Sequence, residues 1–446
     1  MKSVLTQAKK NAIPSKKLQK EKTEIAKLAY SLVGKQVSKH PEVTSIEFAG
    51  SYAKGTWLPS KADIDIFIKF KKLTPEKKFI EVSKKIGFES LRKFNPYVRY
   101  SEHPYVEAKI KGTKVNVVPC YDVIRGNWQS AADRSPFHTK FMLESLTGTM
   151  KDEVRLLKDF LMCNEIYGAE IAKQGISGYV TEVLVLNFGS FQDVISAVAK
   201  LKQNQVIGKP TKKFDTSIVI IDPIDSNRNL GAAISVENVG KFVLVCRAFM
   251  KKPSISFFKP KAKPIVPKKN LENTIVVKFN FKSRSPDIIW GQIKRASTSL
   301  ATQMELEGFK VLRKAATTDE KKEAWLLFLM QSLKIDGDEV REGPDFFFEG
   351  DSEVFIRKNS KKSKIMWIDS SKKIHSLQKR QHDDAKQFLQ DLLKNHLNKS
   401  GVPKGLKADI KKGFKIVIAD KTNGKSIKEA LAELVSTDAT IFSSTQ

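Results

Sequence analysis

Two aspartates separated by one residue open a strongly apolar segment. Asp63 and Asp65 belong to the run Asp-Ile-Asp-Ile-Phe-Ile, which predicts a strand. Side chains two positions apart on a strand point to the same side, so the two carboxylates are brought together. Such a pair is unfavourable unless a cation lies between its members, and hard divalent ions prefer oxygen ligands. The spacing therefore predicts a divalent-metal site, with Mg²⁺ as the expected ion.

A glycine-serine turn precedes this strand. Backbone N–H groups of Gly50 and Ser51, together with the Ser51 hydroxyl, can hold phosphate oxygens, and Lys54 adds a positive charge. For the aspartates alone, the competing interpretation is an edge strand with a solvated polar face. The turn and the aspartates together predict a site for a metal and a nucleoside triphosphate.

This combination resembles the signature of the polymerase-beta-like nucleotidyltransferase superfamily, in which two acids hold the metals of nucleotidyl transfer and the Gly-Ser element grips the triphosphate. Further segments, from about residue 20 to about residue 260, resemble the archaeal-type, class I, CCA-adding enzymes in content and order. They are Thr56-Trp57-Leu58, Glu102-His103-Pro104-Tyr105, Val117-Val118-Pro119-Cys120-Tyr121, Asp133-Arg134-Ser135-Pro136-Phe137-His138, Ile166-Tyr167-Gly168-Ala169-Glu170, Ser177-Gly178-Tyr179, and Asp222-Pro223 with Arg228-Asn229.

The resemblance implies an activity and a set of partners. CCA-adding enzymes are tRNA nucleotidyltransferases that build or repair the 3′-terminal CCA of tRNA from CTP and ATP without a nucleic-acid template. The implied ion is Mg²⁺, and the implied oligomer is a homodimer. Two other classes stay open: a relative of the same superfamily that adds only A, such as a poly(A) polymerase or an oligoadenylate synthetase, and an RNA-binding protein that has lost catalysis.

The resemblance also implies roles for individual residues. His138, Lys158 and Tyr167 would contact the incoming nucleotide, as would Gly50, Ser51 and Lys54. Arg228 would help to select the base. Weaker candidates are His103, Arg134 and Asn229. Without the family, a helix face carrying Lys158 would be read as a solvated surface, and Arg228 as one partner of a structural salt bridge.

One position departs from the family pattern. Asn116 stands in Lys114-Val115-Asn116-Val117-Val118-Pro119-Cys120, where a third metal-binding carboxylate is expected beside Asp63 and Asp65. An asparagine oxygen can touch a metal but brings no charge. Glu107 on the preceding strand or Asp122 could compensate for the missing acid.

Composition points to a polyanionic partner. The chain has 79 Lys and Arg against 49 Asp and Glu, a formal net charge of +30, which favours nucleic acid. No apolar run approaches the ~18 residues that span a bilayer, and the N-terminus lacks the apolar core of a signal peptide, so no membrane and a cytoplasmic location are expected. The cysteines, Cys120, Cys163 and Cys246, lie in apolar contexts without metal-site spacing and are expected to be buried, reduced thiols.

The expected fold class is a multidomain α+β protein. A nucleotidyltransferase domain with a mixed palm sheet and helices spans residues 1–145, with a helix at 15–37, strands at 43–49 and 63–70, and a hairpin at 106–110 and 114–119. A helical central domain spans 146–258, and a linker rich in Lys and Pro spans 259–270.

Residues 271–446 are expected to form a tRNA-binding body and tail. Strands at 274–282, 309–316 and 324–333 with a helix at 287–308 suggest an RNA-recognition-like βαββ layer. An amphipathic helix at 377–397 and a last strand at 414–419 follow. The run Phe346-Phe347-Phe348 is expected in the core, with a base-stacking platform as the alternative.

Overall fold

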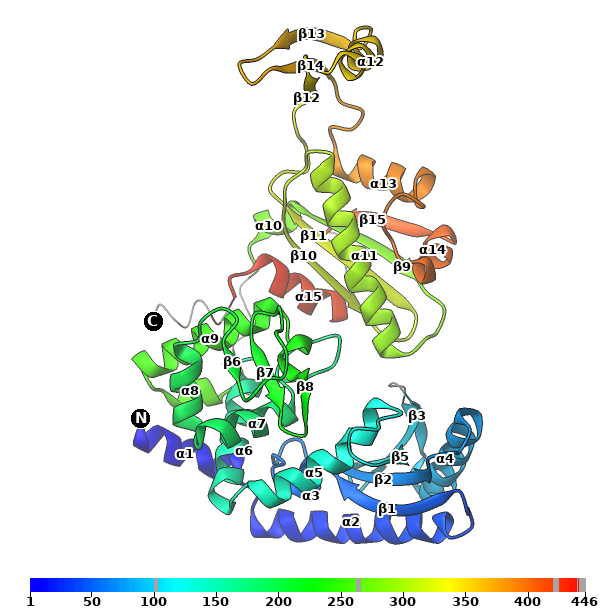
Figure 1. The fold of residues 1–446 in the computed structure, drawn as a ribbon, viewed down its shortest axis with the longest axis vertical. Helices are drawn as coiled ribbons and strands as arrows, with labels where there is room; N and C mark the ends of the chain where they lie inside the picture. Colours follow the sequence, from blue (N-terminus) through cyan, green and yellow to red (C-terminus); the bar gives the residue numbers. More distant parts are fainter. Residues whose placement is uncertain (100–102, 262–265, 420–424, 439, 441–446) are drawn as a thin grey trace. The chain divides into compact units, whose positions relative to one another are not determined.

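The computed structural model describes residues 1–99, 103–261, 266–419, 425–438 and 440. The chain divides into two compact units, Met1–Ala262 with Thr437–Gln446 (the first unit) and Lys263–Ser436 (the second unit) (Figure 1). Within the described ranges, no single helix is long and apolar enough to cross a membrane. The bent pair α7 (Gly178–Phe188) and α8 (Phe191–Ala199), broken by 93°, qualifies only jointly, by length and composition.

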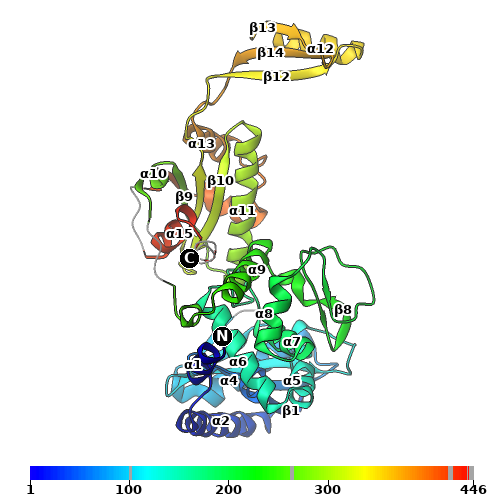
Figure 2. The same ribbon diagram turned by 90° about the vertical axis from the view of Figure 1, so that its left-hand side faces the viewer.

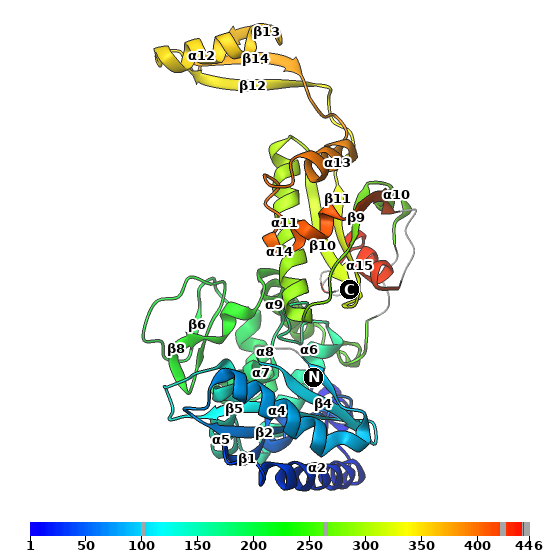
Figure 3. The same ribbon diagram turned by 90° about the vertical axis from the view of Figure 1, so that its right-hand side faces the viewer.

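A mixed five-stranded sheet, in the order β1-β2-β5-β4-β3, carries the N-terminal part of the first unit. Strands β2 and β5 are parallel, and the other neighbours are antiparallel. Helices α2 (Lys16–Val37) and α4 (Glu76–Leu91) pack on one face (Figure 3). The strands are β1 (Val43–Ala49), β2 (Ile64–Lys71), β3 (Tyr97–Arg99), β4 (Tyr105–Ile110) and β5 (Thr113–Asp122). The predicted helix, hairpin and mixed sheet are confirmed, and so are the strands, except that Asp63, predicted to begin the second strand, lies in the loop directly before β2.

Alternation along β2 decides which face carries the acids. Ile64, Ile66 and Ile68 are fully buried against α2 and α4. Successive side chains point to opposite faces, so Asp65 and Phe67 lie on the other face. On that face Phe67 packs with Ala132 of η2 (Ala131–Asp133), near α3 (Gly50–Lys54) and α5 (Arg134–Ser145). The short helix η1 (Arg92–Phe94) follows α4.

Helices dominate the rest of the first unit. Their shared apolar core contains a cluster of aromatic rings from Phe160, Phe191, Phe249, Phe257 and Phe258. The helices are α1 (Lys2–Ala12), α6 (Gly148–Cys163), α7, α8, α9 (Val236–Lys251), η3 (Leu230–Ala233) and η4 (Ile255–Phe258). A small sheet, in the order β6-β7-β8, adds β6 (Val206–Ile207), β7 (Val219–Asp222) and β8 (Asp225–Asn229).

The helical core also includes residues from the N-terminal helix α1. Leu5 and Ala8 of α1 belong to the helical core, although they lie at the start of the chain. Of the predicted linker, residues 262–265 lie outside the described residues. Cys120 and Cys246 are buried and Cys163 is half-buried, and all three are free thiols, so the expectation of full burial is wrong for Cys163.

The second unit is built on a four-stranded sheet in the order β10-β11-β9-β15. Helices α11 (Pro286–Leu306), α13 (Ala385–Asn395) and α14 (Lys404–Lys411) cover one face, and α15 (Lys425–Val435) packs on the other (Figure 3). The strands are β9 (Thr274–Asn280), β10 (Val311–Thr318), β11 (Glu323–Met330) and β15 (Phe414–Ile418), and α10 (Lys268–Glu272) precedes them. The sequence β9-α11-β10-β11 confirms the predicted βαββ layer.

A second, three-stranded sheet in the order β12-β14-β13 carries α12 (Glu349–Asn359) (Figure 2). Its strands are β12 (Asp338–Asp345), β13 (Ser363–Ile368) and β14 (Lys373–Lys379). The helix predicted at 377–397 is wrong at its start and forms only from Ala385, because 377–379 pair with β12 and β13 instead. Phe346, Phe347 and Phe348 are 38%, 72% and 63% exposed, so the core interpretation of this run is also wrong.

Candidate active site

Asp65, Asn116 and Glu107 form a row across the sheet, here called the polar row. Asp65 on β2 is aligned with Asn116 on β5, and Asn116 is aligned with Glu107 on β4. Residues aligned on neighbouring strands share a face, so all three lie opposite the core formed with α2 and α4. Asp63 stands in the loop directly before β2. Strand register thus places Asp65, Asn116 and Glu107 on one face, and Asp63 directly precedes that face in the chain.

Gly50 packs directly against the Asp65 carboxylate. Its φ is +71°, and a Cβ at this position would lie 2.1 Å from Asp65 Oδ2. Only a residue without a side chain combines this backbone angle with so close an approach. The turn that the sequence assigned to phosphate binding therefore lies beside the acids because residue 50 is glycine.

Only the nitrogen of the Asn116 side-chain amide has a hydrogen-bond partner among the described residues. Its Nδ2 donates to Asp65 Oδ1 at 2.8 Å, whereas its Oδ1 is buried and has no hydrogen-bond partner among the described residues. An unsatisfied buried oxygen costs about 1–3 kcal/mol, which a cation at this point would offset. With Asp63 and Asp65 it gives an all-oxygen donor set that fits a hard divalent ion. As the side chains are oriented, the described residues contain no group of three or more His, Cys, Asp and Glu placed to hold a metal, because position 116 is an amide and the Glu107 carboxylate contacts Tyr97 and Arg99.

Glu107 completes the row and is 3% exposed. Its Oε1 accepts a hydrogen bond from Tyr97 Oη, and its Oε2 lies 3.5 Å from Arg99 Nε. Burial raises the pKa of Asp65 to about 6, against the hydrogen bond from Asn116, and the negative charges of Asp63 and Glu107 push the pKa in the same direction as burial. The site therefore concentrates acidic groups in surroundings that disfavour their charge unless a cation joins them.

Two cavities lie beside these residues, and three side chains, Ser51, Lys158 and Tyr167, line both of them. The smaller cavity, 100 Å³, is lined by Ser51, Thr56, Trp57, Leu58, Lys61, Asp63, Asp65, Lys158, Met162 and Tyr167. The larger, 240 Å³, is lined by Gly50, Ser51, Lys54, Ser135, His138, Thr139, Lys158, Tyr167, Gly178, Tyr179 and Glu182. Most residues that the sequence proposed for nucleotide binding thus line one shared region.

A buried charge cluster, made of Lys54, Thr56, Lys158 and Glu182, contributes to the lining of both cavities. Lys54 Nζ pairs with Glu182 Oε2, and Thr56 Oγ1 donates to Glu182 Oε1 at 2.6 Å. Lys158 Nζ donates to the Thr56 carbonyl and hydroxyl at 3.0 Å each and to Glu182 Oε1 at 3.2 Å. All three N–H donors of Lys158 therefore have partners within the protein.

Charge and burial act on this cluster in opposite directions. Burial lowers the pKa of Lys158 to about 8, although Glu182 favours its charged form. Burial alone would raise the pKa of Glu182, but Lys54 and Lys158 outweigh it and hold that pKa below its usual range. The carboxylate therefore stays ionised between two ammonium groups.

A second cluster is centred on the buried Asp222. His138 Nε2 lies 2.9 Å from Asp222 Oδ2, Tyr179 Oη donates to Oδ1 at 3.0 Å, and Arg228 Nη1 donates to Oδ2 at 3.0 Å. The His138 ring stacks on Tyr179 with centroids 3.8 Å apart. Burial lowers the pKa of His138, so its neutral form prevails near pH 7. The Arg228 side chain is 40% exposed, so its guanidinium is anchored at one end and open at the other.

The three weaker candidates lie away from the cavity linings. His103 packs edge-on against Phe79, a core residue behind the sheet, and Glu102 of the same segment lies outside the described residues. Arg134 Nε lies 3.6 Å from Asp225 Oδ2. Asn229 Oδ1 accepts from the Ile220 and Gly231 amides, and its Nδ2 donates to Thr216. These contacts give Asn229 a structural role in the β7–β8 hairpin.

Sequence reasoning missed the anions that organise the basic residues. The sequence assigned no role to Glu182, which lies inside the apolar helix α7, or to Asp222, which belongs to the segment Asp222-Pro223. In the sequence each is a single acid within an otherwise apolar run. An acid in such a run is expected to be buried, and a buried acid rarely lacks a partner. The sequence likewise predicted no role for Thr56, Trp57 and Tyr179, although all three line the cavities.

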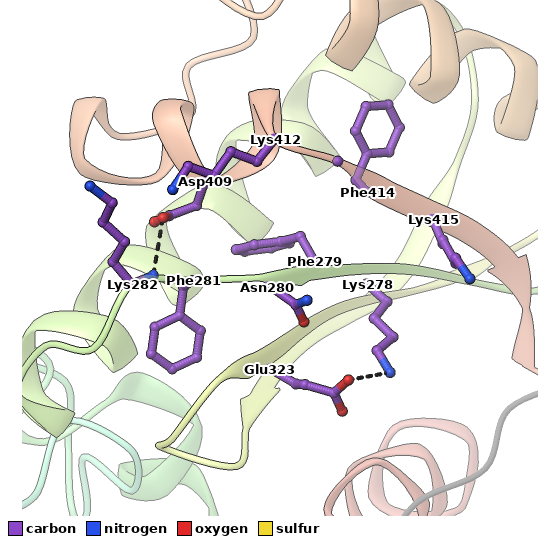
Figure 4. Close-up of a pocket in the computed structure, with 11 residues that line it drawn as sticks. Lys278, Phe279, Asn280, Phe281, Lys282, Glu323, Asp409, Lys412, Phe414 and Lys415 are labelled. Atoms are coloured by element: carbon purple, nitrogen blue, oxygen red, sulfur yellow. Dashed lines mark hydrogen bonds and ion pairs between the residues drawn. The ribbon is translucent and has the colours of Figure 1, made fainter.

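The second unit has a separate groove of 530 Å³, lined by residues of the neighbouring strands β9 and β15 and of the segments beside them (Figure 4). Its acids are partnered: Glu323 pairs with Lys278 at 2.6 Å, and Asp409 accepts from the Lys282 amide and pairs with Arg284. Lys412 and Lys415 also line the groove and are exposed. The groove therefore presents positive charge to solvent.

Three family models match consecutive parts of the chain. A nucleotidyltransferase domain matches residues 32–145, the second domain of tRNA nucleotidyltransferase matches 152–259, and the C-terminal domain of CCA-adding enzymes matches 272–419. The mixed sheet with its Gly-Ser turn and paired aspartates, and the first of these models, define a nucleotidyltransferase.

Curated relatives give a finer assignment. The CCA-adding enzyme of Pyrobaculum islandicum is 31% identical over 403 residues, covering 90% of this chain and 94% of that protein. Those of Methanothermobacter thermautotrophicus and Archaeoglobus fulgidus are 32% and 37% identical, covering 86% and 70% of this chain and 86% and 73% of those proteins. The chain belongs to the archaeal-type CCA-adding enzyme family, which confirms the resemblance seen in the sequence.

Proposed function

We propose that this chain adds or repairs the 3′-terminal CCA of tRNA from CTP and ATP by template-independent, Mg²⁺-dependent nucleotidyl transfer. The main support is the family match along most of the chain, together with Asp65 beside Asn116 on the sheet and Asp63 in the loop directly before β2. The alternative of a superfamily member that adds only A is not favoured, because the C-terminal half also matches the CCA-adding model.

The reaction would be in-line attack of the tRNA 3′-hydroxyl on the α-phosphate of CTP or ATP, with pyrophosphate leaving. Asp63, Asp65 and the Asn116 oxygen would hold Mg²⁺, which when bound lowers the pKa of the attacking hydroxyl and neutralises charge on the phosphate. That Asp63, Asp65 and Asn116 do so is our assignment, supported by the buried, unpartnered Asn116 oxygen.

The other residues would bind and orient the triphosphate. We assign phosphate contacts to the Gly50–Ser51 turn, Lys54 and His138, which line the larger cavity. Lys158 would supply charge to the cavity wall while its donors fix Thr56 and Glu182. Tyr167 would form a side of the pocket and Arg228, anchored on Asp222, would read the base.

The remaining proposals concern organisation and partners. We infer a catalytic domain at 1–145, a helical domain at 146–258, a linker at 259–270 and a tRNA-binding region at 271–446, supported by the family-model ranges. The net charge of +30 and the groove lysines Lys412 and Lys415 support contacts to RNA phosphates. A homodimer, a cytoplasmic location and the absence of a membrane partner remain proposals from the sequence.

The decisive experiment is incorporation into tRNA that ends at the nucleotide before CCA. With labelled CTP and ATP together, we expect C, C and A to be added in order and then to stop. CTP alone should give two additions. Extension by ATP alone into a long tail would instead identify a poly(A)-type enzyme, and tRNA binding without any incorporation would identify a catalytically silent relative.

A further inference from the structure

We propose that Glu107 serves as the third carboxylate of the divalent-metal site, in place of the acid that position 116 lacks. This inference rests on the proposed function, because it assigns a further ligand to the same metal site. In this chain an amide occupies one position of the polar row and a carboxylate occupies the next.

The strand register places Glu107 where it can act. Glu107 is aligned with Asn116, which is itself hydrogen-bonded to Asp65. Aligned side chains on antiparallel strands have Cβ atoms about 4.5–5.5 Å apart and share a face. A glutamate extends one methylene further than an aspartate, so a carboxylate starting from the next strand can reach toward the position that an aspartate at 116 would serve.

Burial argues against a purely structural Glu107. The side chain is 3% exposed on the sheet face that carries Asp65, and both its charge and that of Asp63 disfavour ionisation of Asp65. A carboxylate that only tied Tyr97 and Arg99 to the sheet would not need this location. A cation shared with the two aspartates would turn the repulsion into attraction.

The present partners of Glu107 are replaceable. Tyr97 is 42% exposed and the Arg99 side chain is 43% exposed, and both come from the edge strand β3. Because Tyr97 and Arg99 reach solvent, water can take over their polar groups when the carboxylate leaves them. A cation beside Asn116 would then offset the loss of these contacts to a buried charge, about 1.5–3 kcal/mol each.

Asp122, the other acid that could compensate, is too far away. It lies on the same strand as Asn116, six positions further on, is exposed, and is aligned with Lys71. At about 3.3 Å per residue this separation is about 20 Å. Register thus leaves Glu107 as the carboxylate beside position 116.

The test measures Mn²⁺ binding by the full-length chain, using electron paramagnetic resonance of free Mn²⁺ and no nucleotide. Glu107→Gln, which keeps the shape and removes the charge, should weaken Mn²⁺ affinity at least about tenfold. Asn116→Asp in the Glu107→Gln background should restore affinity to near the parent value. Asp122→Asn is the matched control and should leave affinity unchanged.

Tyr97→Phe separates metal binding from a structural role. It removes one partner of the carboxylate and frees it to turn toward Asn116, so the proposal predicts tighter Mn²⁺ binding by Tyr97→Phe. A structural Glu107 predicts instead that neither Tyr97→Phe nor Glu107→Gln changes Mn²⁺ affinity. Unchanged affinity in Glu107→Gln, or no rescue by Asn116→Asp, would overturn the inference while leaving the CCA-adding function intact. Failure of the parent chain to bind Mn²⁺ or to incorporate CMP would overturn both.

Discussion

Asn116 and Asp65 are joined across two parallel strands by a hydrogen bond of 2.8 Å. The amide donates to the carboxylate, so this pair is stable without a cation. An aspartate at position 116 would replace the bond by repulsion between two acids, which a bound metal, or a proton shared between the two carboxyl groups, would relieve.

The Asn116→Asp variant should therefore become metal-dependent in its stability. In EDTA we expect the free energy of unfolding to fall by about 1–3 kcal/mol, the cost of leaving a buried polar group without its partner. Mg²⁺ should then raise the Tm more in the variant than in the parent. Thermal unfolding with and without Mg²⁺ measures both effects, and an equal Mg²⁺ response in the two proteins would contradict the placement of residue 116 at the metal.

Asp63→Ala and Asp65→Ala should each lower CMP incorporation by at least roughly 10³-fold, because each removes a charge from the metal site. Affinity for tRNA should remain within about threefold, since RNA binding depends on basic residues elsewhere. Single-turnover incorporation and a filter-binding assay separate the two properties. Near-normal turnover in both variants would exclude these aspartates from the reaction.

Gly50→Ala and Gly55→Ala form a matched pair, because both positions have a positive φ, +71° and +69°. Each substitution should cost about 1–2 kcal/mol of stability for the left-handed backbone. Only at residue 50 would the new Cβ meet Asp65 Oδ2, at 2.1 Å, whereas at residue 55 it meets only Lys151 at 3.7 Å. Mn²⁺ affinity should thus fall in Gly50→Ala alone, and equal metal binding by the two variants would argue against the contact.

Glu182→Gln should destabilise the first unit by about 3–5 kcal/mol at pH 7, because it leaves the buried ammonium groups of Lys54 and Lys158 without their anion. The pKa of Lys158 is already lowered to about 8, below its value in an unfolded chain. Between these two pKa values the unfolded chain binds more protons, so stability rises with pH in this window.

The loss caused by Glu182→Gln should accordingly shrink as the pH rises from 7 through about 8, the pKa at which Lys158 becomes neutral in the folded parent. Urea unfolding at pH 7 and pH 9.5 measures it. Glu237→Gln, at an exposed position on α9, is the control and should show no such change. A loss independent of pH would mean that Glu182 acts through packing.

Arg228→Ala should change the ratio of kcat/KM for CTP over ATP about tenfold or more, because its guanidinium is held by Asp222 and would read polar atoms of the base. Arg228→Lys keeps the charge but loses the planar fork, so it should recover little of the discrimination. Arg247→Ala, an exposed arginine on α9, serves as the control. Parallel losses for the two nucleotides would assign Arg228 to the triphosphate instead.

Lys412→Gln with Lys415→Gln should reduce the slope of log affinity for tRNA against log salt by about 0.7–0.9 for each lysine that contacts a phosphate. Both lysines line the groove in Figure 4. The pair Lys394→Gln with Lys399→Gln, exposed on and after α13, removes equal charge elsewhere in the second unit. Identical slopes for the two double variants would show that the groove is not a specific contact.

Local pattern was sufficient to predict the sheet and the side on which the acids lie. The alternation of Ile64, Ile66 and Ile68 fixes the direction of Asp65, and the Lys111-Gly112 turn, with φ of 47° and 77°, closes the β4–β5 hairpin that carries Asn116. Because these signals involve neighbours in the chain, they can be read without the fold.

Contacts between distant elements could not be predicted in this way. Glu182 meets Lys54 across 128 residues, and Asp222 meets His138 across 84. The choice between Glu107 and Asp122 required the register between β4 and β5 rather than the presence of either acid. Pairing with β12 and β13 likewise removed residues 377–379 from the predicted helix, because tertiary contacts override local propensity.

The buried charge cluster also constrains how the pocket can open. Lys54 and Thr56 follow the first strand of the sheet, whereas Lys158 and Glu182 belong to helices α6 and α7. A hinge between sheet and helices would separate these charges at a cost of about 3–5 kcal/mol. Since each 1.4 kcal/mol is a factor of ten, the parted form would hold only about one molecule in a few hundred to a few thousand. We therefore expect nucleotides to enter and leave the pocket without separation of the sheet from helices α6 and α7.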